Sequence, residues 1–160
     1  MTLDSLPVWA NYPLQFLVSM IATMSFGISF QVPRRHHLAC GVVGAVGWLV
    51  YVLAQAAGLT APAATLLAAL PLTAFARLFA ITHKAPVTLF LLCGIFPLVP
   101  GAGIYYTAYY FLRNDQRLFT NKGFETLKVA VALALGIALV CSLPLPRSIS
   151  RQQYNGPRHN

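Results

Sequence analysis

The sequence predicts an all-α, polytopic membrane protein with about five transmembrane helices, of which the fourth is broken by proline and glycine. Hydrophobic residues make up 58% of the chain and charged residues 9%, whereas a soluble domain carries roughly 25% charged residues. The chain also contains a series of apolar runs, each approaching the roughly 20 residues that cross the hydrocarbon core of a bilayer. These runs cover residues 9–32, 38–57, 63–82, 87–112 and 129–145.

Short proline-containing connectors separate the first four runs. Pro33, Pro62 and Pro86 lie at run edges, where a missing N–H group removes no bond inside a helix. The mixed segment 113–128 is longer, and we expect it to be a connector with Asp115 in a loop.

The ends of the chain differ from its apolar middle. Residues 1–146 are expected to form the transmembrane helical domain, and residues 147–160 a polar, basic and disordered tail. The chain starts without the cationic stretch of a signal peptide, so we expect the first apolar run to remain as a membrane helix.

Charge is strongly biased toward cations, with 11 Lys and Arg against three Asp and Glu and a net charge of +8. The cations lie in connectors and in the tail, which favours a role in membrane orientation over nucleic-acid binding. Charge counting leaves open whether the fourth run crosses the membrane or re-enters. We favour an arrangement with the N-terminus outside and the C-terminus inside.

Chemistry-bearing residues are sparse. Cys40, Cys93 and Cys141 lie in apolar runs and are expected to act as packing residues. The sequence shows no metal-ligand spacing, no nucleophile–base pair and no phosphate-binding loop. We therefore predict no enzyme activity, no metal site and no cofactor.

Small residues recur along the second run. Gly41, Gly44 and Gly47 are three residues apart and predict a flat strip that lets a neighbouring helix approach closely. The alternative is that glycine is simply frequent in membrane helices.

The fourth run contains the most informative motif. Pro97, Pro100, Gly101 and Gly103 interrupt it and free backbone groups, which lipid tolerates only beside protein or a watery cavity. The motif predicts a substrate path, in which N–H groups after the break meet a carboxylate and carbonyls before it meet an ammonium. A kinked structural helix is the alternative.

Three polar side chains are candidates for the same path. Tyr105 and Thr107 follow the break and are expected to offer hydroxyl groups, although Thr107 could bond back to its own helix. Arg77 lies within the third run, and its guanidinium suits a substrate carboxylate. Its alternative is to extend to the nearby membrane interface.

Two further expectations concern the connectors. His36 and His37 are expected to be interfacial and solvated, with pH sensing as the alternative. Glu125 and Lys128 are expected to form a surface ion pair, since they are three residues apart.

The chain resembles the small, YjjB-like half of the threonine/serine exporter (ThrE) family over nearly its whole length apart from the termini. The most specific stretch is the run from Phe96 to Thr107. The other matching stretches are Val32-Pro33-Arg34-Arg35, Gly41, Gly44, Gly47-Trp48, Ala76-Arg77, Lys84-Ala85-Pro86 and Glu125-Thr126-Leu127-Lys128.

This resemblance implies a multi-pass inner-membrane (plasma-membrane) exporter of threonine and serine that is coupled to the proton gradient. It also implies a companion membrane subunit, because split family members place this half on a separate short chain; a homo-oligomer is the other option. Some split pairs are linked to succinate export, so a dicarboxylate exporter subunit is one alternative. A non-transporting assembly subunit is the other.

Overall fold

The computed structural model describes residues 8–144 of the chain, and every element within that range is helical. Residues 1–7 and the predicted tail over residues 147–160 lie outside the described residues. The helices are α1 (Val8–Ser29), η2 (Arg34–His36), α2 (His37–Ala56), α3 (Ala61–Thr82), α4 (Val87–Gly94), η3 (Phe96–Leu98), α5 (Gly101–Leu112) and α6 (Gln116–Ser142).

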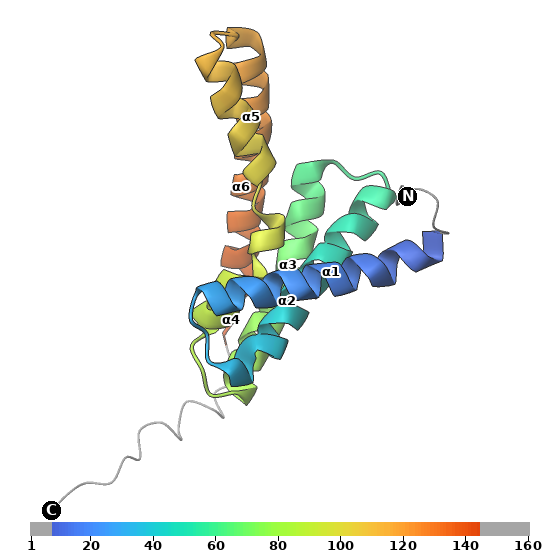
Figure 1. The fold of residues 1–160 in the computed structure, drawn as a ribbon, viewed down its shortest axis with the longest axis vertical. Helices are drawn as coiled ribbons and strands as arrows, with labels where there is room; N and C mark the ends of the chain where they lie inside the picture. Colours follow the sequence, from blue (N-terminus) through green and yellow to red (C-terminus); the bar gives the residue numbers. More distant parts are fainter. Residues whose placement is uncertain (1–7, 145–160) are drawn as a thin grey trace, which may run out of the picture.

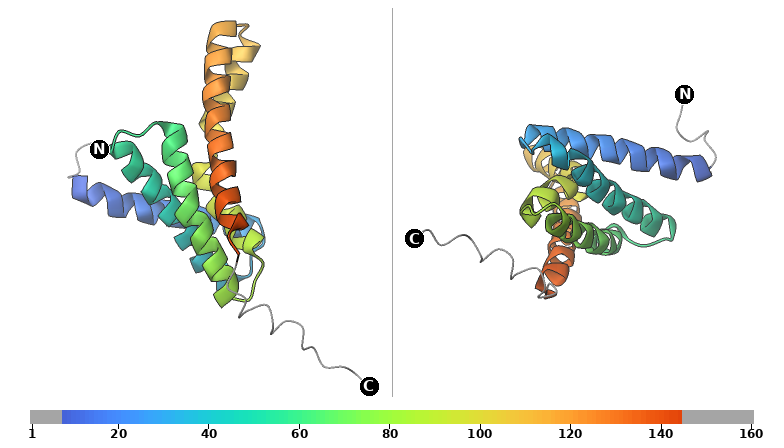
Figure 2. Two further views of the ribbon diagram at one scale, coloured as in Figure 1. Left: turned by 180° about the vertical axis from the view of Figure 1, so that it is seen from behind. Right: turned by 90° about the horizontal axis from the view of Figure 1, so that it is seen from below.

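The all-α membrane architecture predicted from the sequence is confirmed. Four helices, α1, α2, α3 and α6, are long and apolar enough to cross a membrane, and the bent pair formed by α4–η3 and α5 adds a fifth if it is one span. Figures 1 and 2 show a body in which α2 lies between α1 and α3, with α4 beside them.

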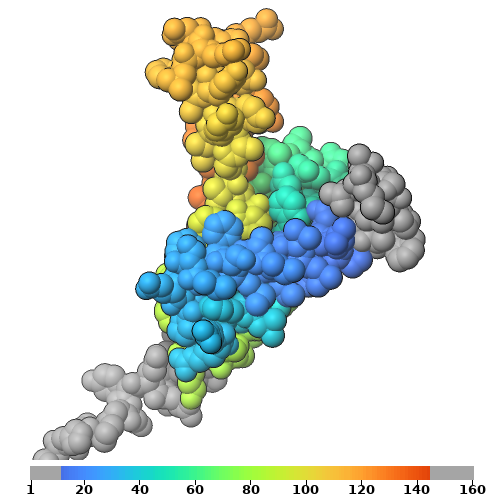
Figure 3. Space-filling view, viewed as in Figure 1, coloured from blue at the N-terminus to red at the C-terminus, as the bar shows by residue number. Residues whose placement is uncertain are grey.

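α5 and the first half of α6, residues 116–128, form an arm that projects from this body (Figures 1 and 2). The space-filling view shows this arm standing clear of α1 (Figure 3). α5 packs on α6 and contains no buried residue. The second half of α6 returns to the body and packs on α3.

α3 and α6 run in the same direction. Gly136 of α6 lies against Ala69 of α3, and Val140, further along α6, lies by Arg77, further along α3. The chain between two parallel helices has to return from the end of the first to the start of the second. This geometry favours a full crossing by α4 and α5 over a re-entrant loop.

Glycines set the spacing of the body helices. A Cβ atom at Gly41 would lie 2.7 Å from Met24 Cγ of α1, and one at Gly44 would overlap Thr23 of the same helix. A Cβ at Gly47 would lie 2.6 Å from Leu72 Cδ1 of α3. The strip therefore admits two neighbours, α1 at its start and α3 at its end.

The expected connector over 113–128 is wrong, because α6 begins at Gln116. Asp115 is the residue that starts the helix: its carboxylate accepts a hydrogen bond of 3.1 Å from the N–H of Leu118, which satisfies one of the free donors of the first turn. Glu125 pairs with Lys122 at 2.8 Å, so the predicted pair with Lys128 is also wrong. Charges spaced in this way are compatible with a helix.

Four helices end in the same way. Gln31, Gly58, Lys84 and Asn114 have positive φ angles of 55°, 86°, 51° and 55°. In each case the next residue donates to a carbonyl five positions back, as in Asp115 N to Tyr110 O at 3.1 Å. This closing turn satisfies carbonyls that the helix leaves free.

We predict that Gly44→Ala destabilises the protein by about 1–3 kcal/mol, the usual cost of overpacking, because its methyl group would overlap Thr23. The measurement is the thermal unfolding midpoint in detergent. Gly101→Ala is the matched control, since a Cβ there meets no atom within 4 Å. Equal midpoints for the two variants would contradict the close approach of α1 and α2.

Candidate functional site

The break in the fourth span lies between Gly94 and Gly101, and its two halves are bent by 57°. Pro97 and Pro100 have no N–H group to give to the preceding turn. The chain tightens instead into a short 3₁₀ turn, in which Leu98 N donates to Ile95 O at 2.9 Å and Val99 N donates to Phe96 O at 3.3 Å.

The break leaves polar backbone groups open on both of its sides. Of the four carbonyls from Phe96 to Val99, those of Phe96 and Val99 accept backbone N–H groups, at 3.3 and 2.7 Å. Within residues 8–144, no backbone N–H donates to the carbonyls of Pro97 or Leu98. On the other side, the N-terminus of α5 has no side-chain cap and no acidic residue in its first turn.

Gly101 begins α5 and has open space beside it, because a Cβ at this position would meet no atom within 4 Å. A small ligand can therefore approach the backbone here without displacing a side chain. Acceptor carbonyls and the positive end of a helix dipole thus lie within a few residues of each other.

Aromatic side chains from the end of α1 and from the turn after it cover one side of the break. Phe96 stacks on Phe26 with ring centroids 4.1 Å apart and lies 5.4 Å from the ring of Phe30. Sequence reasoning did not assign these two phenylalanines to the site. Their spacing of four residues, which places them on one helical face, is the signal that could have found them.

Gly103 and Thr107, both predicted path residues, lie in the contact between α5 and α6. A Cβ at Gly103 would lie 2.5 Å from Thr126 Oγ1, and one at Gly123 would lie 3.5 Å from Thr107 Cγ2. The Thr107 hydroxyl donates to Gly103 O at 2.7 Å, which is the alternative bond that the sequence left open.

Tyr105, the tyrosine predicted to line the path, lies on the side of α5 away from α6. Its side chain is 64% exposed, and its ring stacks on Tyr109 with centroids 6.4 Å apart. Tyr106 and Tyr110 form a second stacked pair of the same spacing. Tyr105, Tyr106 and Tyr109 are exposed and Tyr110 is half-buried. The rings form an aromatic face on the arm, and Tyr105 does not lie with Thr107.

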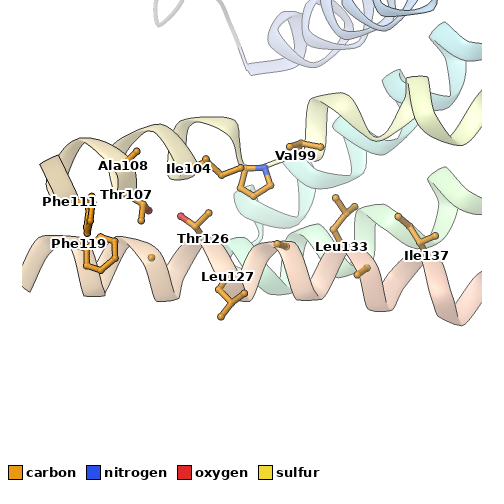
Figure 4. A pocket seen from close by; sticks show the side chains of 14 residues that line it. Val99, Ile104, Thr107, Ala108, Phe111, Phe119, Thr126, Leu127, Leu133 and Ile137 are labelled. Atoms are coloured by element: carbon orange, nitrogen blue, oxygen red, sulfur yellow. The ribbon is translucent and has the colours of Figure 1, made fainter. Parts of the chain in front are cut away.

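A groove of about 660 Å³ runs between α5 and α6. Figure 4 shows side chains of the two helices facing each other along it, with Phe111 and Phe119 at one end and Leu133 and Ile137 toward the other. Only Thr107 and Thr126 bring hydroxyl groups to its lining, and both donate to carbonyls of their own helices at 2.7 Å. The groove is therefore an apolar packing surface and offers little to a hydrophilic substrate.

Comparison with known proteins identifies the family. The model of the family described as threonine/serine exporter, ThrE, matches residues 15–143, a stretch that runs from α1 to the end of α6. The chain belongs to the threonine/serine exporter (ThrE) family. The resemblance inferred from the sequence is thus confirmed, and it identifies a membrane protein of a transporter family. No curated protein and no solved structure matches the chain.

In this member of the ThrE family, Arg77 binds the end of α6. Its guanidinium donates to the carbonyl of Val140 and, at 2.6 Å, to that of Leu143. Val140 lies in the last turn of α6 and Leu143 directly follows the helix, where helical partners for carbonyl groups run out. The arginine that was expected to meet a substrate carboxylate therefore links α3 to the C-terminal end of α6.

We predict that Arg77→Leu destabilises the protein by about 1–3 kcal/mol, because it removes a charged donor from the carbonyls of Val140 and Leu143. Hydrogen exchange followed by mass spectrometry should show faster exchange at the end of α6, around residues 138–144. Arg117→Leu, which removes an exposed cation from the other end of the same helix, is the control. Unchanged exchange in Arg77→Leu would show that the arginine does not hold α6.

Proposed function

We propose that this chain is one membrane subunit of a proton-coupled exporter of small amino acids, threonine or serine, in the inner (plasma) membrane. The observation that carries the proposal is the break at residues 95–100, with its open carbonyls and uncapped helix end, in a chain of the ThrE family. Broken spans of this kind form the substrate sites of many transporters.

The two sides of the break suit the two charges of an amino acid. The carbonyls of Pro97 and Leu98 are acceptors for an ammonium group. The N–H groups that follow Gly101 in the first turn of α5 are donors for a carboxylate, since that of Gly101 donates to Val99 O. The open space beside Gly101 leaves room for a small side chain. The geometry thus favours Pro97, Pro100 and Gly101 most among the predicted path residues. Gly103 and Thr107 contribute indirectly, because they hold α5 against α6.

The geometry favours an amino acid over a dicarboxylate. A dicarboxylate needs donors or cations at both of its ends, but the break pairs one positive helix end with carbonyl acceptors. Arg77, the cation within the third span, is engaged by Val140 and Leu143. Competition for efflux by threonine, serine and succinate tests this choice, and we expect succinate to compete poorly.

The bare arm supports the need for a companion subunit or a second copy. α5 packs on one helix and buries none of its residues, so a single chain encloses the break incompletely. The exposed arm is equally compatible with a non-transporting assembly subunit, so it does not separate the two roles. Reconstitution into liposomes separates the two roles, since threonine flux that requires this chain together with its companion supports a transporting subunit.

We predict that Gly101→Leu abolishes threonine export without affecting folding, because the new side chain enters open space beside the break. The measurement is intracellular threonine in cells fed with a threonine-containing peptide. Efflux should fall to the level of cells that lack the chain, with unchanged amounts of protein in the membrane. Ala138→Leu, at an exposed position of α6, is the matched control, and normal efflux by Gly101→Leu would exclude the break as the path.

A further inference from the structure

His36 is buried, with 2% of its surface exposed. The sequence-based expectation that it is interfacial and solvated is therefore wrong. It lies in η2, at the turn between α1 and α2. Its ring meets the ring of His83, at the end of α3, edge-on at a centroid distance of 5.2 Å. It also meets Phe90 of α4 edge-on at 5.6 Å. One imidazole therefore joins the α1–α2 turn to the α3–α4 turn.

The hydrogen bond made by His36 fixes its protonation state. Arg35 Nε donates to His36 Nε2 at 2.9 Å, and a guanidinium has no acceptor. His36 Nε2 must therefore be the unprotonated nitrogen of a neutral ring, with the proton on Nδ1. That Nδ1 atom is buried and has no hydrogen-bond partner among the described residues.

Among residues 8–144, the surroundings of His36 contain no counter-charge for a second proton. The charged or titratable groups that act on it are Arg35 from its own turn and His83 from α3, and Phe90 faces it from α4. The acidic residues of the described chain, Asp115 and Glu125, belong to the arm. Protonation of Nε2 would remove the acceptor for Arg35 and place like charges side by side in a buried site.

We propose that His36 is a proton-sensitive latch that holds the α1–α2 turn against the α3–α4 turn while neutral and releases it when protonated. Burial and the neighbouring Arg35 hold the pKa of His36 below the usual value of a histidine, so its protonation requires an acid pH. The latch contacts α4 through Phe90, which is fully buried, and α4 leads directly into the break at Pro97. A link between the latch and transport rests on the exporter function proposed above, whereas the latch itself does not.

The experiment is hydrogen exchange of the purified full chain in nanodiscs at pH 7.5 and pH 5.5, with labelling times scaled to the chemical exchange rate. We expect residues 83–95 of the wild type to lose protection at the acid pH. His36→Gln should abolish this loss, because the glutamine oxygen accepts from Arg35 and does not titrate. His83→Gln should retain the loss, since the latch depends on His36.

A second pair of variants keeps the test decisive if His36→Gln folds poorly. Arg35→Gln keeps a donor for His36 but removes the like charge. The closed latch then tolerates a protonated His36 better, so release should move to a lower pH. Arg34→Gln removes the same charge from the same turn without a bond to His36 and should behave as the wild type. Three results would each overturn the proposal. The wild type could keep its protection at the acid pH, His36→Gln could lose protection as well, or both arginine variants could shift the release equally.

Threonine efflux measured on the same variants separates the two proposals. If protection responds to acid through His36 but the chain supports no efflux with any companion, the latch stands and the exporter function fails. If the chain supports efflux but protection of residues 83–95 does not respond to acid, the latch is wrong and the exporter function stands.

Discussion

The whole structure depends on the need to satisfy backbone polar groups where no water is present. In the hydrocarbon core each bare N–H or C=O group costs several kcal/mol, so spans are helical from end to end unless something shields the exception. The ends of α1, α2, α3 and α5 follow this rule through closing turns, and α6 follows it through Arg77. The carbonyls of Pro97 and Leu98, which accept no backbone N–H group within residues 8–144, are the exception to this rule.

Small residues are the second requirement, because they bring the helices close enough to shield one another. Gly44 and Gly47 do so in the body, where α1 and α3 approach α2. Gly103 and Gly123 do so in the arm, each facing a threonine of the opposite helix. The glycines after the break therefore have different roles: Gly103 holds α5 on α6, whereas Gly101 leaves space beside the backbone.

Features that depend on local chemistry could be predicted from the sequence. Apolar runs gave the spans, and two prolines within one run gave the break, because proline removes a backbone donor wherever it lies. The start of α6 could not be predicted from composition, because the mixed segment 113–128, which contains the first half of α6, resembles a connector, although Asp115 is a good helix cap. The role of Arg77 could not be predicted, since its partners lie more than 60 residues away in the chain. Burial of His36 depends in the same way on His83 and Phe90, which only the fold brings to it.

The most direct test is whether water and substrate reach the break. In a chain whose native cysteines are replaced, Gly101→Cys would be exposed to a charged, membrane-impermeant thiol reagent, with Ala138→Cys on the outside of α6 as the reference. The account predicts fast modification at position 101 that excess threonine slows, and slow modification at position 138 that threonine does not affect. Equal, threonine-independent rates at the two positions would show that the break faces lipid and would contradict the account.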